Sequence, residues 1–167
     1  MTLKEKIQTD LKNALKEKKE LELSVWRLLS AAITGKEKNK RYKLSKAKPE
    51  LAEDALAKAS ELSDQEVLEV IGSEVKKRRE AALEFEKGNR RELAEKETKE
   101  AEILGQYLPT QFTEEEIKKL VKDAVAKTGA RDLKDMGKIM SELMPKVKGK
   151  ADGNLVNRIV KEQLMAE

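Results

Sequence analysis

The side chains that could do chemistry in this chain are lysine, arginine, carboxylate and hydroxyl groups, because it contains neither cysteine nor histidine. A chain without these two residue types has no thiol nucleophile, no imidazole base and no metal site built on Cys or His. Its 32 acidic residues offer so many pairs at helical spacing that no single pair indicates acid–base catalysis. The sequence therefore predicts no catalytic residue, no metal and no cofactor, and a protein that is not an enzyme on its own.

The most specific local pattern is a basic turn at residues 145–154, PKVKGKADGN. Three lysines at alternate positions and one glycine come before an expected helix that begins at Asp152, and a second glycine follows this aspartate. A helix N-terminus carries free N–H groups and a partial positive charge, which favour phosphate. We interpret this turn as a candidate contact to the phosphate backbone of RNA. Its candidate RNA-binding residues are Lys146, Lys148, Gly149, Lys150 and Asn154.

The same turn could instead be a solvated connection between two helices. In that case the glycines supply backbone geometry, and Asp152 caps the following helix. An aspartate in that position would occupy the N–H groups that a phosphate needs. The residues of the turn leave both interpretations open.

A second candidate is the densest basic run, residues 76–79, together with two arginines at 90–91. Four consecutive helical residues point around the whole helix, so the run does not form one patch. A solvated helix surface is the favoured interpretation. The alternative is a secondary basic surface made of Lys76, Lys77, Arg78, Arg79, Arg90 and Arg91.

Aromatic and methionine residues also allow two interpretations each. Trp26 borders an apolar stripe, so a place at the edge of the core is favoured over a platform for base stacking. Tyr42, among basic residues, is the better stacking candidate. Methionine recurs every four residues at 136, 140 and 144, which is typical of a helix in a core, although methionine also suits partner grooves.

Apolar residues repeat at steps of three and four along most of the chain, and this spacing predicts an all-α fold. We expect an N-terminal domain over residues 1–108. It begins with a hairpin of helices at about 3–18 and 21–38. Two longer helices follow, the first opened by a capping box at Ser63.

Pro109 disfavours helix at the residue before it and marks the domain boundary. We expect a C-terminal domain of three short helices over residues 113–167. The first opens with a capping box at Thr113. The middle one should stop at Pro145, where a helix loses a hydrogen bond. Between the hairpin and the longer helices, Pro49 suits the first turn of a short helix, and the stretch around it could equally be mobile.

Overall charge and hydropathy limit the possible partners. The chain has 36 basic and 32 acidic residues, for a net charge of +4, and the charges are interspersed. Any site for a polyanion must therefore be local. No apolar run approaches the length of a membrane span, and the first residues are unlike a signal peptide. We expect a cytoplasmic protein with no membrane partner.

Several motifs, in the expected order, resemble the bacterial GatB/YqeY family. They are KRRE at 77–80, FEKG at 85–88, RELAEKE at 91–97, YLPTQ at 107–111, DMGK at 135–138 and KVKGKADG at 146–153. Residues 43–61 depart from the family's pattern and are expected to be an insertion. The resemblance implies an all-helical fold whose C-terminal domain is similar to the tail of the GatB subunit of glutamine-dependent tRNA amidotransferases.

The resemblance also implies a function and partners. The GatB tail contacts tRNA, while the chemistry lies in other domains and subunits that this chain lacks. By position, the basic turn of that tail falls on Lys146, Lys148, Gly149 and Lys150. We therefore expect a non-catalytic helical module that associates with tRNA or another RNA.

Two alternatives remain open at this point. One is an accessory factor of the amidotransferase, a carbon–nitrogen ligase that uses glutamine as amido-nitrogen donor. Partner subunits would then supply the active site. The other is a protein–protein adaptor, whose apolar groove would come from the methionine row or the first helical hairpin.

Overall fold

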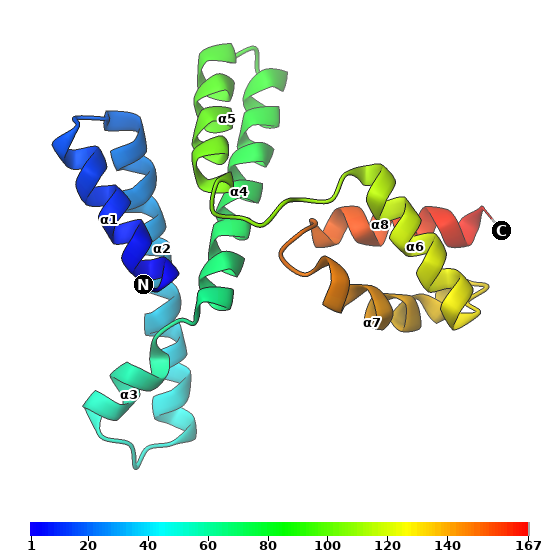
Figure 1. The fold of residues 1–167 in the computed structure, drawn as a ribbon, viewed down its shortest axis with the longest axis horizontal. Coiled ribbons are helices and arrows are strands. Elements are labelled where there is room, and N and C mark those ends of the chain that lie inside the picture. Colours follow the sequence, from blue (N-terminus) through cyan, green and yellow to red (C-terminus); the bar gives the residue numbers. More distant parts are fainter. Residues whose placement is uncertain (167) are drawn as a thin grey trace. The chain divides into compact units, whose positions relative to one another are not determined.

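A computed structural model describes residues 1–166 and shows an all-α protein, as the apolar periodicity predicts. The described residues form eight α-helices and one short 3₁₀-helix, and none of them forms a strand. The chain divides into two compact units, Met1–Tyr107 and Leu108–Glu167 (Figure 1). That each unit folds as an independent domain stays a prediction.

The first unit contains two helical hairpins and a short helix between them (Figure 1). In one hairpin α1 (Leu3–Lys16) packs against α2 (Glu20–Ala47), and in the other α4 (Asp64–Lys87) packs against α5 (Arg91–Gly105). The short helix α3 (Glu53–Ser60) packs on α2. Contacts of α2 with both α4 and α5 join the hairpins into one unit.

Side-chain caps fix where several of these helices begin. The predicted capping boxes at Ser63 and Thr113 both form, and a third that was not predicted forms at Thr2. The turn between α1 and α2 has neither glycine nor proline. Instead, Lys18 takes up a left-handed conformation with φ 56°. That conformation is uncommon for lysine, so no residue type marks the turn, although the predicted helix bounds place it to within two residues.

The largest departure from the predicted helices is in α2, which continues to Ala47 instead of ending near residue 38. One side of its later turns packs against the rest of the unit, and there Glu37, Lys40 and Leu44 are partly buried. Pro49 lies in the turn that follows α2, so its predicted place in the first turn of a short helix is wrong.

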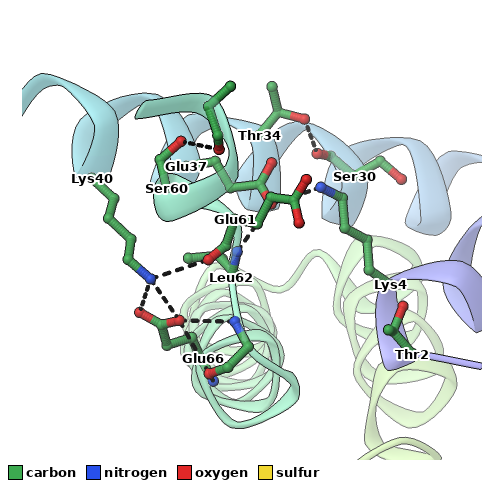
Figure 2. A network of polar contacts seen from close by, with 12 residues as sticks. Thr2, Lys4, Ser30, Thr34, Glu37, Lys40, Ser60, Glu61, Leu62 and Glu66 are labelled. Carbon is green, nitrogen blue, oxygen red and sulfur yellow. Dashed lines mark hydrogen bonds and ion pairs between the residues drawn. The ribbon is translucent and has the colours of Figure 1, made fainter. Parts of the chain in front are cut away.

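A polar network joins this part of α2 to α1 and to the start of α4 (Figure 2). The ammonium group of Lys40 donates to both carboxylate oxygens of Glu66, at 2.8 and 2.9 Å, and to the carbonyl oxygen of Glu61 at 3.1 Å. Glu37 accepts hydrogen bonds from the Lys4 ammonium at 2.7 Å and from the Leu62 N–H at 3.2 Å. These contacts fix where the chain enters α4.

This network makes part of the stability depend on pH. The hydrogen bond from Lys40, with those from the Ser63 backbone and hydroxyl, lowers the pKa of Glu66 to about 2. A lowered carboxyl pKa adds stability above the ordinary pKa and loses it as the pH falls towards the folded value. We expect Glu66→Gln to be less stable than the wild type at pH 7. The two should converge as the pH falls towards about 2.

Urea unfolding at several pH values, followed by helical circular dichroism, measures this convergence. The glutamine oxygen can still accept the capping hydrogen bonds of Ser63, so the comparison isolates the pairing with Lys40. A stability difference that stays constant across the acid range would show that the ion pair with Lys40 contributes nothing.

The second unit is a three-helix arrangement around its own core. It contains α6 (Glu114–Thr128), the 3₁₀-helix η1 (Leu133–Asp135), α7 (Met136–Val147) and α8 (Gly153–Met165). Its core side chains are almost completely buried and come from all three α-helices; the largest of those that are fully buried are Ile117, Val121, Ile139, Leu143, Val156 and Val160.

The prediction that Pro145 ends the middle helix is wrong, because α7 runs through it to Val147. Leu143 and Val147 lie four residues apart and are both buried in the core of this unit. Their burial holds one more turn of helix despite the hydrogen bond that proline cannot make.

Candidate nucleic-acid interface

The basic turn connects α7 to α8 and is braced by the residues before α6. The Phe112 N–H donates to the carbonyl oxygen of Lys150 at 2.8 Å, and the Gln111 side-chain amide donates to that of Gly149 at 2.9 Å. Gly149 has a φ of 75°, in the left-handed region that favours glycine. The turn therefore has a fixed backbone from which the exposed side chains of Lys146, Lys148 and Lys150 project.

Each of these lysines interacts with a neighbouring group. Lys146 lies 3.5 Å from the Glu142 carboxylate, but Lys127 binds the same oxygen at 2.6 Å. The hydrogen bond from Lys127 is the main cause that holds the pKa of Glu142 below its usual range. The Lys150 ammonium lies 5.7 Å from the centre of the Phe112 ring. Because Glu142 is shared, it offsets only part of the positive charge of this surface.

The N-terminus of α8 is capped from within the turn. The Asp152 carboxylate accepts a hydrogen bond from the Asn154 N–H at 2.7 Å. That N–H is therefore not free for a phosphate, as the alternative interpretation of the turn expected. Any phosphate contact would come from the lysine side chains and from the exposed side chain of Asn154.

The six residues of the predicted secondary basic surface do not share one face. Arg78 is buried, with 6% of its surface exposed, and so does not belong to a surface at all. Its guanidinium binds the carboxylates of Glu74 at 2.9 Å and Glu100 at 3.1 Å, within the α4–α5 hairpin. Burial opposes the ionisation of Glu74. Hydrogen bonds from Lys77 and Arg78 outweigh it and bring the pKa below its usual range.

The other members of that surface lie apart. Lys76 is partly buried, and Lys77 is exposed and bound to Glu74 at 2.7 Å. Arg79 is exposed on α4, about two helical turns before the connection to α5 where Arg90 and Arg91 lie. The side chains of residues 76–79 thus point in different directions, some into the interior and some to the surface. This is expected, because four consecutive helical residues surround the helix.

The aromatic residues have different environments. Trp26 is 4% exposed and packs edge-on against Tyr107, with ring centres 5.3 Å apart, so the prediction of a core position is confirmed. Tyr42 is 61% exposed, and the Lys46 ammonium lies 4.9 Å from its ring centre. Tyr42 therefore remains available for stacking, whereas Trp26 does not.

The methionine row is divided. Met136 and Met140 pack against the core of the second unit, while Met144 is 42% exposed. This arrangement gives no continuous methionine groove.

Within residues 1–166, no three Asp or Glu side chains are grouped to hold a metal ion. The same residues contain no helix with both the length and the apolar character needed to cross a membrane.

One group of basic residues was recognised from the sequence only as the surroundings of Tyr42, and not as part of a continuous helix. Because α2 extends to Ala47, it carries several exposed lysines beyond residue 35 on one continuous helix. The predicted end of this helix near residue 38 separated them. Apolar spacing could not reveal this helix, because its packed positions between Ile33 and Leu44 are Glu37 and Lys40.

Comparisons with known proteins agree with the motifs. A family model described as Yqey-like protein matches residues 36–164. A glutamyl-tRNA(Gln) amidotransferase subunit from Methanobrevibacter smithii is 42% identical over 59 residues, which cover 33% of this chain and 10% of that subunit. "Altered inheritance of mitochondria protein 41, mitochondrial" from Pyrenophora tritici-repentis is 29% identical over 168 residues, covering 97% of this chain and 81% of that protein. This chain thus spans about a tenth of the amidotransferase subunit and most of the fungal protein.

Proposed function

The chain belongs to the Yqey-like protein family, and from this premise we propose that it is a helical tRNA-binding module without an active site of its own. The observation that carries the proposal is the braced basic turn between α7 and α8. Similarity to a subunit named for a tRNA amidotransferase supports tRNA as the ligand. A cytoplasmic location is part of the same proposal.

The proposed mechanism is phosphate binding by lysine side chains on a rigid turn. Hydrogen bonds from Gln111 and Phe112 hold the backbone of the turn, so little ordering is needed when its side chains bind. Contacts to phosphate position an RNA without reading its sequence. Each lysine that neutralises a phosphate releases counterions, so the affinity should fall steeply as salt is added.

A triple variant tests this mechanism. We expect Lys146→Ala, Lys148→Ala and Lys150→Ala together to weaken tRNA binding. The slope of log K against log salt should become shallower by about 2–3, because three phosphate contacts are lost. Fluorescence anisotropy of labelled tRNA at several salt concentrations measures both effects.

The matched control removes the same charge from exposed lysines elsewhere in the second unit, Lys119, Lys122 and Lys161. This control should leave the salt slope close to that of the wild type. If both triple variants change the slope equally, the protein's overall charge drives binding and the turn is not the site.

The second candidate function is an accessory role in tRNA-dependent amidation. The short similarity to the amidotransferase subunit favours it. In that case the purified protein should bind amidotransferase subunits in a pull-down and accelerate transamidation of charged tRNA. The methionine row gives little support to the adaptor function, because two of its three methionines contact the core.

A further inference from the structure

We propose that the second half of α2 is a separate RNA-docking face on the first unit, at which lysines bind phosphates and Tyr42 stacks on a base. This inference goes beyond the basic turn of the second unit and does not depend on it. It rests on the charge, the pairing and the exposure of residues 36–48.

This segment carries a strong excess of positive charge. Seven of its thirteen residues are basic, and Glu37 is the single acidic one. By contrast, the whole chain is nearly balanced, with 36 basic and 32 acidic residues. The excess of charge is therefore local, as a site for a polyanion requires.

The only acidic residue of the segment, Glu37, lies on the packed side of α2. Glu37 binds the Lys4 ammonium at 2.7 Å and faces the polar network with α1 and α4 (Figure 2). On the same side Lys40 binds Glu66 at 2.8 Å. These two ion pairs hold α2 against its neighbours, and Lys40 is the one lysine of the segment that takes part in them.

The open side keeps its positive charge. Five exposed lysines and one exposed arginine have no carboxylate within 4.0 Å among the described residues; these are Lys36, Lys38, Arg41, Lys43, Lys46 and Lys48. Some exposed lysines elsewhere, such as Lys77 and Lys118, have carboxylate partners, so the positive charge of this segment is less compensated than theirs. Uncompensated charges along one helix attract phosphate and speed its association.

Tyr42 lies among these lysines and distinguishes RNA from other polyanions. Its ring is 61% exposed, with the Lys46 ammonium 4.9 Å from its centre. An exposed aromatic ring beside basic residues is the arrangement that stacks on bases of a single strand. The exposed residues of 35–48 include no Leu, Ile, Val, Phe, Trp or Met. This face therefore offers little to a lipid surface or an apolar peptide.

The test uses the full chain with single-stranded RNA and, as a polyanion without bases, inorganic polyphosphate. We expect Lys38→Ala, Lys43→Ala and Lys46→Ala together to make the salt slope for RNA shallower by about 2. Tyr42→Leu should weaken RNA binding about tenfold and leave polyphosphate binding unchanged, whereas Tyr42→Phe should behave like the wild type. The charge-matched control removes three unpaired lysines of the same unit, Lys12, Lys16 and Lys99.

Repeating the measurements with Lys146, Lys148 and Lys150 also replaced separates this face from the basic turn. The α2 effects should persist in that background. The proposal is overturned if the α2 triple variant matches its control, or if Tyr42→Leu weakens polyphosphate binding as much as RNA binding. Failure of the turn variant alone would contradict the proposed function and leave the α2 face intact.

Discussion

Replacing Arg78 with methionine is expected to lower the free energy of unfolding of the first unit by about 3–5 kcal/mol. Arg78 and Glu100 are 6% and 5% exposed and form an ion pair at 3.1 Å between α4 and α5. Removing the guanidinium leaves the Glu100 carboxylate buried without its main partner. Lys96, at 4.0 Å and largely exposed, is a poor substitute.

Two further variants show whether the lost partner causes this effect. Arg78→Lys keeps the charge but lacks the fork that reaches Glu74 and Glu100 together, so an intermediate loss is expected. Arg78→Met combined with Glu100→Leu should recover much of the stability, because an apolar pair leaves no buried charge. Urea unfolding measured by circular dichroism gives all three values. A loss of less than about 1 kcal/mol for Arg78→Met would show that water reaches this pair.

Replacing Trp26 with alanine is expected to cost about 3–5 kcal/mol, the usual range for a buried aromatic residue. Trp26 is 4% exposed and packs edge-on against Tyr107 at the end of α5. The Tyr107 hydroxyl in turn donates to the Asp10 carboxylate of α1. Trp26 thus helps to join α1, α2 and α5, and its loss removes apolar contact among all three.

This substitution also separates the core position of Trp26 from a role in base stacking. Affinity for tRNA should stay within about twofold of the wild type under conditions where the variant remains folded. Trp26→Phe, which keeps a ring beside Tyr107, should cost clearly less stability. A variant that stays stable but binds RNA weakly would contradict the core assignment and make Trp26 part of the interface.

The elements that the sequence predicted well depend on local patterns. The capping boxes at Ser63 and Thr113 open α4 and α6 as expected, because each cap needs only residues three positions apart. The end of α6 is equally local, because Gly129 there takes up the left-handed conformation that glycine favours. The all-α fold followed from the apolar spacing, which is a property of each helix by itself.

The features that escaped prediction depend on contacts far apart in the chain. The extension of α2 to Ala47 is held by the pairing of Lys40 with Glu66, 26 residues away. Arg78 looked like surface charge because its partner Glu100 lies on the next helix. The continuation of α7 past Pro145 depends on a core that all three helices of the second unit complete.

The candidate site shows the same division. The types and spacing of Lys146, Lys148 and Lys150 identified a turn before α8, and Asp152 was recognised as its cap. The bracing of that turn by Gln111, 38 residues away, could not be read from local spacing. This bracing supports the interpretation of the turn as a binding surface, because the three lysine side chains project from a backbone that is held in place.

Titration of the purified protein with bulk tRNA, at about 50 and about 200 mM salt with heparin as competitor, tests the central claim most directly. Binding through three phosphate contacts should weaken about 20- to 40-fold between these salt concentrations. Binding to tRNA that also persists against heparin is the result we predict. No binding at the lower salt concentration, or complete loss to heparin, would contradict a tRNA-binding function and leave only the fold in common with the amidotransferase subunit.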